Sequence, residues 1–347
     1  MSELLQITER PRLEYSEEVA EELLPLYQKV RDVIPPMEWA FHAPYIKAIN
    51  ELKKERNAVI LAHNYMGPEI FHGVGDFRGD SLQLAIEAGR TDAEIIVQAG
   101  VHFMAETSKL MNPEKLVLMP DMEAGCSLAE SITAEDVRLL REQQPGLPIV
   151  TYINTSAAVK AECDVTCTSA NAANIVRRIA AEFGTREVIM LPDEYLAKNI
   201  AAELKAEGLK LLIWQGHCEV HERFRPEDLR TMRGDNPGLK IVAHPECPPD
   251  VIKEADFAGS TSAMIRWIEE KQPKKVMLVT ECSMSANIAV TAPSVRFIRP
   301  CNLCPHMKRI TLQNILDSLL YLRNPIEIDE NIVSRARAAV ERMIRLS

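Results

Sequence analysis

The chain has 347 residues, 46% of them hydrophobic, which is enough for a substantial core and, at roughly 150 residues per domain, for about two domains. Its net charge of −10 argues against a nucleic-acid partner, because such proteins present a basic face. No apolar run approaches the roughly 20 residues of a membrane span, and residues 1–18 lack the apolar core of a signal peptide. We therefore expect a cytoplasmic protein that handles small molecules, has no membrane partner, and uses its eight cysteines for metal binding or reactivity rather than structural disulfides.

The chain begins with a predicted helical extension, residues 1–54, and continues with one pattern three times. Three apolar runs rich in β-branched residues end in polar clusters: NAVILAHNY (57–65), PIVTYINTS (148–156) and LKIVAHPEC (239–247). Within these runs, His63, Asn154 and His244 follow one another at steps of 91 and 90 residues. A fixed period of this kind indicates an internal triplication.

Three further landmarks recur in the same order. A small polar pair, expected to cap a helix, precedes each helical pattern, and Ser81, Ser169 and Ser260 in these pairs are 88 and 91 residues apart. A second strand-like run follows in each repeat: AEIIVQAG, REVIMLPDE and KKVMLVTEC. After another helical segment, a third run leads into a cysteine, and these cysteines, spaced by 92 and 86 residues, are Cys126, Cys218 and Cys304.

Strands that alternate with helices predict an α/β fold of small parallel sheets with helices on both faces. We expect three homologous αβα sandwich repeats, residues 55–146, 147–237 and 238–330, followed by an amphipathic C-terminal helix at 331–347. Repeats this small bury little surface alone, so we expect them to pack around a pseudo-threefold axis.

Ligands of parallel α/β sheets bind beyond the carboxyl ends of the strands, where all these landmarks lie. Three converging cysteines suit a 4Fe-4S cluster with one iron open to a substrate better than structural zinc, which takes four protein ligands. Each cysteine also precedes a predicted helix start, which would lower the thiol pKa. Two alternatives stay open. Cys301 and Cys304 could form a redox dithiol or a disulfide. Cys218, His221 and His244 could bind zinc, although a supporting position beside the site suits His221 better. The other four cysteines are expected to be small buried residues: Cys163, Cys167, Cys247 and Cys282.

The polar residues at the first strand ends supply phenols, imidazoles and a carboxylate, enough for several proton transfers. They are His63, Tyr65, Tyr152, Asn154, His244 and Glu246. Three capped helix N-termini facing one cavity would bind anions, such as carboxylates or a phosphate. The residues expected to do so are Ser81, Ser169 and the pair Ser260 and Thr261. A redox sensor that used the cluster or the C-x-x-C pair as its switch would need neither group of residues.

At these positions the sequence resembles the quinolinate synthase family, the iron–sulfur enzymes of bacterial NAD (pyridine nucleotide) biosynthesis. The matching segments lie between residues 57 and 316 in the family's order: AHNYMGPEI, GDSLQLA, YINTSAAVKAECDVTCTSANA, WQGHCEVHERF, HPECPPDV, GSTSAMI and CNLCPHMKRITLQNI. The resemblance implies three αβα domains around a pseudo-threefold axis. It also implies a transferase or lyase-type condensing enzyme that joins iminoaspartate to dihydroxyacetone phosphate, with loss of phosphate and water, to give quinolinate.

The resemblance also implies roles for individual residues. Cys126, Cys218 and Cys304 would hold a 4Fe-4S cluster whose open iron acts as a Lewis acid. Tyr65, Glu246 and His244 would be catalytic, with Tyr65 and Glu246 moving protons. The expected substrate-binding residues are His63, Ser81, Tyr152, Asn154, Ser169, Ser260 and Thr261. An L-aspartate oxidase or aspartate dehydrogenase would supply iminoaspartate and is the expected transient partner.

Overall fold

The computed structural model describes residues 11–347; residues 1–10, the start of the predicted N-terminal extension, lie outside the described residues. The chain forms two compact units, which are described separately. Unit 1 comprises the described residues up to Ala124 together with Cys282–Pro293 and Leu303–Glu327, and unit 2 comprises Gly125–Glu281, Ser294–Asn302 and Ile328–Ser347.

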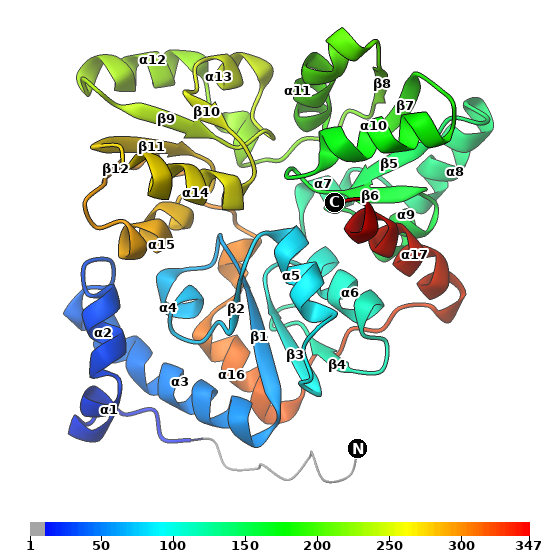
Figure 1. The fold of residues 1–347 in the computed structure, drawn as a ribbon. Coiled ribbons are helices and arrows are strands. Elements are labelled where there is room, and N and C mark those ends of the chain that lie inside the picture. Colours follow the sequence, from blue (N-terminus) through cyan, green and yellow to red (C-terminus); the bar gives the residue numbers. More distant parts are fainter. Residues whose placement is uncertain (1–10) are drawn as a thin grey trace. The chain divides into compact units, whose positions relative to one another are not determined.

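Three small sheets, each of four parallel strands, carry the fold, as the sequence predicts (Figure 1). All three have the same strand order: β2-β1-β3-β4, β6-β5-β7-β8 and β10-β9-β11-β12. The first-sheet strands are β1 (Ala58–His63), β2 (Phe77–Gly79), β3 (Ile95–Ala99) and β4 (Leu116–Leu118). The second-sheet strands are β5 (Ile149–Tyr152), β6 (Val165–Cys167), β7 (Glu187–Leu191) and β8 (Lys210–Ile213). The third-sheet strands are β9 (Lys240–Ala243), β10 (Phe257–Ala258), β11 (Lys275–Val279) and β12 (Arg296–Ile298).

Unit 1 holds the first sheet between two pairs of helices. Helices α3 (Pro36–Glu55) and α16 (Leu312–Tyr321) contact each other and the strands β1 and β3, and so do α5 (Ser81–Ala88) and α6 (His102–Met111). Figure 1 shows the two pairs on opposite sides of these strands. The shorter helices of this unit are α1 (Glu17–Glu22), α2 (Leu24–Val30), α4 (Pro68–Phe71) and α15 (Ser283–Thr291), with a 3-10 turn at Met307–Arg309.

Unit 2 holds the other two sheets. The second sheet contacts α10 (Ala172–Glu182) and α11 (Glu194–Leu204), and the C-terminal helix α17 (Glu330–Leu346) packs on β6 and α9 (Ala157–Ala161). The third sheet shares a buried core with the residues of α12 (Pro226–Asp235) and α13 (Pro249–Lys253). The remaining elements are α7 (Ser127–Glu130), α8 (Ala134–Gln143), α14 (Thr261–Lys271) and 3-10 turns at Lys205–Glu207 and His221–Arg223.

One aspartate in each repeat ties its edge strand to the first strand. Asp76, Asp164 and Asp256 each directly precede an edge strand, and each carboxylate accepts a hydrogen bond from a first-strand amide, at 2.8, 2.7 and 2.9 Å. A basic side chain pairs with each of them: Lys53, Arg141 and Lys240. The edge strands β2, β6 and β10 are absent from the sequence prediction, because their two or three residues, FRG, VTC and FA, belong to no longer apolar run, unlike the equally short β4 and β12.

Within residues 11–347, no helix is both long and apolar enough to cross a membrane.

Candidate active site

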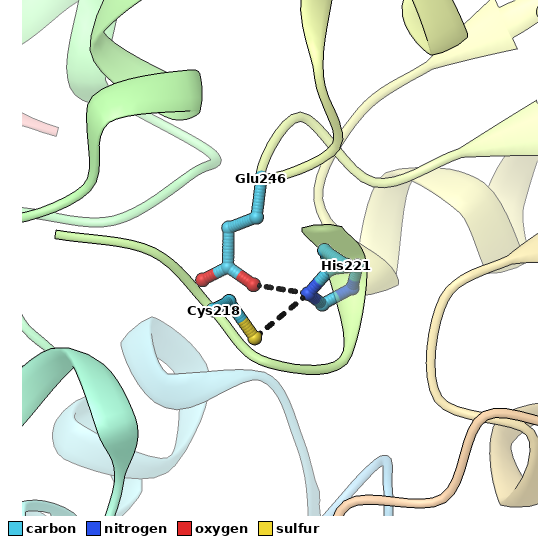
Figure 2. Close-up of side chains that lie close together, drawn as sticks. All are labelled: Cys218, His221 and Glu246. Atoms are coloured by element: carbon cyan, nitrogen blue, oxygen red, sulfur yellow. Dashed lines mark hydrogen bonds and ion pairs between the residues drawn. The ribbon is translucent and has the colours of Figure 1, made fainter. Parts of the chain in front are cut away.

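A buried carboxylate, Glu246, lies at the centre of a polar cluster in unit 2. It follows β9 by three residues, and its Oε2 is 2.7 Å from Nδ1 of His221 and 3.4 Å from Nδ1 of His244. Figure 2 shows the carboxylate and the His221 ring facing each other beside the Cys218 sulfur. The rings of His221 and His244 lie 4.9 Å apart, so the cluster is densely packed.

The two imidazoles determine the charge of Glu246. Burial alone would raise the pKa of this carboxyl, but the charges and hydrogen bonds of His221 and His244 outweigh burial and hold the pKa well below its usual range. Glu246 is therefore ionised and can accept a proton.

Residues that follow strands of the second and third sheets meet at this cluster. The Asn154 Nδ2 donates to Glu246 Oε1 at 3.4 Å, and the Ser169 hydroxyl is 3.1 Å from Nε2 of His244. Tyr152, the last residue of β5, is also buried. The Oδ1 of Asn154 is buried without a hydrogen-bond partner. Buried polar atoms are normally hydrogen-bonded, so this oxygen is available to accept a bond from a ligand.

An asparagine on α11 holds the turn that carries Glu246. The Asn199 Nδ2 donates to the carbonyl oxygens of Pro245 and Cys247, at 2.8 and 3.0 Å. These carbonyls flank Glu246, so the amide fixes the backbone from which the carboxylate extends.

Unit 1 contains a similar turn after β1. The Nδ1 of His63 accepts from the backbone amide of Tyr65 at 3.2 Å, and the two rings meet edge to face at 4.7 Å. The Nδ2 of Asn287, on α15, donates to the carbonyls of Asn64 and Met66 at 3.0 and 2.8 Å.

Cys126 and Cys218 belong to neighbouring segments of unit 2. Ser127, which follows Cys126, donates to the carbonyl of His217 at 3.1 Å and accepts from the amide of Glu219 at 3.2 Å. Both bonds flank Cys218, and both cysteines are half-buried thiols that form no disulfide. The expected lowering of the thiol pKa by a helix start is wrong for Cys218, because burial and the charges of Glu246 and Cys126 raise its pKa, and only a single 3-10 turn follows it.

Cys304 lies in unit 1 and is a half-buried thiol just before the 3-10 turn Met307–Arg309. The nearby Lys308 donates to the Tyr65 carbonyl at 2.8 Å, which connects the Cys304 segment with the turn after β1. Cys301 is disulfide-bonded whereas Cys304 is not, so a disulfide or dithiol between these two residues is wrong.

The remaining cysteines divide into two groups. Cys163, Cys167 and Cys247 are free and buried, as predicted. Cys282 is disulfide-bonded, so its prediction as a small buried free thiol is wrong, and so is the expectation that no cysteine forms a disulfide. A cysteine's sequence neighbours do not reveal a distant sulfur, and this explains both errors.

The helix caps follow the prediction at two of the three pairs. Asp80 caps α5 through the Gln83 amide, with Ser81 next in the helix, and Ser260 caps α14 through the Ala263 amide, followed by the buried Thr261. The pair Thr168 and Ser169 does not cap α10, which begins at Ala172 after Asn171. Here the backbone amide of Thr168 donates a hydrogen bond to Oδ1 of Asn171 at 2.7 Å, which closes an additional turn before the helix.

Two buried residues of unit 2 were missed by sequence reasoning. Asp193, after β7, is fully buried; its Oδ1 accepts from the Leu196 amide at 2.7 Å, and its Oδ2 has no hydrogen-bond partner. Burial and the charge of Glu246 raise its pKa well above the usual range. Thr280, after β11, is equally buried and contacts His221. Their positions directly after second strands, in PDE and TEC, were the available signal.

Comparison with known proteins places these residues in a family. The family model described as "Quinolinate synthetase A protein" matches residues 47–345. The chain belongs to this family. The quinolinate synthetase A match includes every predicted site residue, from His63 to Cys304.

Individual relatives resemble the chain over almost its whole length. It is 58% identical to a quinolinate synthase of Sinorhizobium fredii over 340 residues, which cover 98% of this chain and 93% of the relative. It is 55% identical to that of Caulobacter vibrioides over 332 residues, 96% of this chain and 90% of the relative. It is 61% identical to quinolinate synthase 1 of Mesorhizobium japonicum over 319 residues, 92% and 96% of the two chains.

Proposed function

We propose that the chain is a quinolinate synthase of NAD biosynthesis, which condenses iminoaspartate with dihydroxyacetone phosphate, with loss of phosphate and water. The observation that carries this proposal is the family match over residues 47–345, which includes the buried cluster around Glu246. An L-aspartate oxidase or aspartate dehydrogenase would supply the unstable iminoaspartate.

Cys126, Cys218 and Cys304 are the residues that would hold a 4Fe-4S cluster, with one iron left open. Their chemistry fits, because all three are partly exposed residues outside any disulfide, whereas the cysteines outside the repeat pattern are buried or disulfide-bonded. When bound, the cluster would supply a Lewis-acidic iron that polarises an oxygen atom of the substrate.

The protein's own groups would perform the proton transfers. Glu246 is the base, because it is buried, ionised and held by the imidazoles of His221 and His244. His244 would return protons through Nε2, which faces the Ser169 hydroxyl. Tyr65 would be the second proton carrier, placed by the turn after β1.

The remaining residues would bind the substrates. Tyr152 and Asn154 would position the condensed intermediate, and the unpartnered Oδ1 of Asn154 supports a bond to a ligand donor. Both substrates carry anionic groups, which helix N-termini bind through amides and the helix dipole. The residues that would hold these groups at helix N-termini are Ser81, Ser260 and Thr261. His63 and Ser169, which lie outside a helix start, would bind through their side chains.

Anaerobic purification tests the cofactor and the function separately. We expect a brown protein with about four irons and four sulfides, as the cluster type requires, and quinolinate formation from the two substrates. Cys304→Ser should lose the cluster, whereas Cys163→Ser, at a buried cysteine outside the trio, should keep it. A cluster unchanged by Cys304→Ser would contradict the ligand assignment, and a loaded protein that forms no quinolinate would contradict the function.

A zinc enzyme is the second candidate, because one observation favours it. Ligand atoms of Cys218, His221 and Glu246 lie within 4.8 Å of one another and could hold a single ion. A hydrolase or lyase built on this group would purify with zinc and without acid-labile sulfide, and it would be unaffected by Cys304→Ser.

A further inference from the structure

The residue four positions after each cysteine of the repeat pattern closes the same backbone turn. Its amide donates to the cysteine carbonyl, at 3.0 Å for Cys126, 3.0 Å for Cys218 and 3.1 Å for Cys304. The backbone is therefore alike in the three repeats, but the side chain at this position differs. The residues are Glu130, Glu222 and Lys308.

Lys308 extends from the Cys304 turn to the turn after β1, within unit 1. Its ammonium donates to the Tyr65 carbonyl at 2.8 Å and to the hydroxyl of Ser283, the first residue of α15. An ammonium only donates hydrogen bonds and a carboxylate only accepts them, so a glutamate could not bind a carbonyl oxygen from this position. The third repeat thus has a contact that the glutamates of the other two repeats cannot make.

The hydrogen bond from Lys308 completes the set that holds the turn of Tyr65. Asn287, also on α15, donates to the two carbonyls on either side of the Tyr65 carbonyl, and Lys308 donates to the one between them. The Tyr65 amide donates to Nδ1 of His63. The backbone of Tyr65 is therefore held at its amide and at its carbonyl by different side chains, and these two bonds fix the direction in which the phenol leaves the chain.

We propose that Lys308 is a positioning residue for Tyr65: from the turn that follows Cys304, its side chain binds the Tyr65 carbonyl and so fixes the place of the phenol relative to that cysteine. The turn of Cys304 itself is closed by the Lys308 amide, which any side chain at this position would leave in place. The catalytic consequence rests on the proposed function, in which Tyr65 carries a proton. The order of the Tyr65 turn does not depend on that function and can be measured without turnover.

The first test follows the turn itself by hydrogen–deuterium exchange. The full-length chain is purified anaerobically, and exchange is measured for a peptide that covers residues 63–67. Lys308→Met keeps an unbranched side chain but removes the donor, so we expect the amides of this peptide to exchange about 10-fold faster, as for the loss of one buried hydrogen bond. Lys308→Arg, which keeps a donor, should exchange close to the wild-type rate.

The second test measures turnover and asks whether Lys308 acts through Tyr65. Because loss of a group that supports an active-site residue typically lowers activity about 10- to 100-fold, we expect Lys308→Met to lower kcat by this factor with little change in KM. Lys308→Arg should recover most of it. In a Tyr65→Phe background, Lys308→Met should lower kcat no further, because two changes that act through one phenol are not additive. Wild-type protein that forms no quinolinate would refute the proposed function, while the exchange rates would still decide the role of Lys308.

A matched control separates positioning from a general loss of lysine hydrogen bonds. Lys109, on α6 of unit 1, donates to the carbonyls of Pro113 and Lys115 at 2.9 and 2.7 Å. These carbonyls precede β4, at the opposite end of the strand from the cysteine and the Tyr65 turn. Lys109→Met should therefore leave both kcat and the exchange of residues 63–67 unchanged. Should Lys308→Met not fold, Lys308→Gln, whose side chain is polar but shorter, takes its place with the same expectation.

Three results would overturn the proposal. The first is exchange of residues 63–67 that is identical in the wild type and in the folded Lys308 variant. The second is a further loss of kcat when Lys308→Met is added to Tyr65→Phe, since the lysine would then act elsewhere. The third is a Lys308→Met protein that holds less iron than the wild type, because the role of the side chain would then lie at Cys304.

Discussion

The turns after β1 and β9 are built in the same way within their respective units. In each, a histidine at the end of the strand directs Nδ1 toward the amide two residues later, at 3.2 Å in the first turn and 3.5 Å in the second. In each, an asparagine from a helix donates to the carbonyls one and three residues after that histidine. These asparagines, Asn199 and Asn287, are 88 residues apart, which is the period of the repeats.

The side chain between the two carbonyls differs. The first turn carries Tyr65, a phenol, and the second carries Glu246, an ionised carboxylate. Beside the carboxylate, Nδ1 of His244 lies almost equally far from the amide and from Oε2, at 3.5 and 3.4 Å. The comparison teaches that the same backbone arrangement presents two chemically different side chains, a phenol and a carboxylate, and in the proposed function both would carry protons.

The largest expected effect comes from removing the charge that distinguishes the two turns. Glu246→Gln keeps the shape of the side chain but cannot accept a proton, so we expect quinolinate formation to fall about 10²- to 10⁴-fold. Steady-state kinetics of cluster-loaded protein measures this. The matched control is Glu254→Gln, which breaks a surface ion pair with Arg230 and should retain activity. Full turnover by the Glu246→Gln enzyme would show that Glu246 is not the base.

Removal of the phenol at the corresponding position should cost less. A phenol keeps its proton at neutral pH and would act as a donor only, so we expect Tyr65→Phe to lower kcat by about 10²-fold, the lower end of general acid–base effects. Tyr321→Phe, at a half-exposed tyrosine beside Arg323, is the control. Equal losses in Tyr65→Phe and Glu246→Gln would show that the two turns contribute equally, against our assignment of the base.

The shared device can be broken in both turns. Asn199→Ala and Asn287→Ala each leave two backbone carbonyls without a donor, so we expect each to lower the free energy of unfolding by about 1–3 kcal/mol in urea denaturation. Asn287→Ala should cost less, because it also removes the Asn287 Oδ1, which is buried without a partner. The exposed Asn331→Ala is the control. If both variants have the same free energy of unfolding as this control, the hydrogen bonds from Asn199 and Asn287 do not stabilise the turns.

Much of the fold is predictable because apolar runs recur along the sequence at a regular spacing. Every predicted strand contains an observed one, and the identical strand order of the three sheets follows from the same sequence unit. The edge strands β2, β6 and β10 could not be predicted, whereas those at the opposite edges lie in apolar runs; β10, for example, has only two residues and depends on the hydrogen bond between the Asp256 carboxylate and the Ile241 amide. The proposed packing of three repeats around one axis stays a prediction.

The candidate site was predictable where residues follow a first or third strand, or stand in a polar pair before a predicted helix. Glu246 and His244 were found by that rule, and the structure brings them together with Asn154 and Ser169. Asp193, Thr280 and the two asparagines that bind the turns, Asn199 and Asn287, were missed, because each contacts a partner distant in sequence. A threonine or asparagine alone carries no signal of the imidazole or carbonyl that it meets in the folded chain.

The smallest expected effect concerns Asp193, the buried acid beside the second turn. Because burial and the charge of Glu246 raise its folded pKa above the unfolded value of about 4, the folded state holds this proton more tightly. The wild type is therefore stabilised below pH 4 relative to higher pH, and that contribution is lost as the pH rises through the folded pKa. An amide side chain at this position would not titrate, so Asp193→Asn should gain stability relative to the wild type as the pH is raised from 4 to 9.

The sign of this effect can be checked against Asp136, an aspartate whose pKa is lowered rather than raised by folding. Asp136, in the capping box of α8, accepts from the hydroxyl and amide of Thr133, which lower its pKa. Its contribution is present above the unfolded pKa and lost as the pH falls, so Asp136→Asn should lose stability at neutral pH and match the wild type in acid. Urea midpoints of both variants across this pH range should therefore diverge from the wild type in opposite directions. Parallel changes would mean that Asp193 is ionised in the folded protein, and that the cluster around Glu246 carries two negative charges.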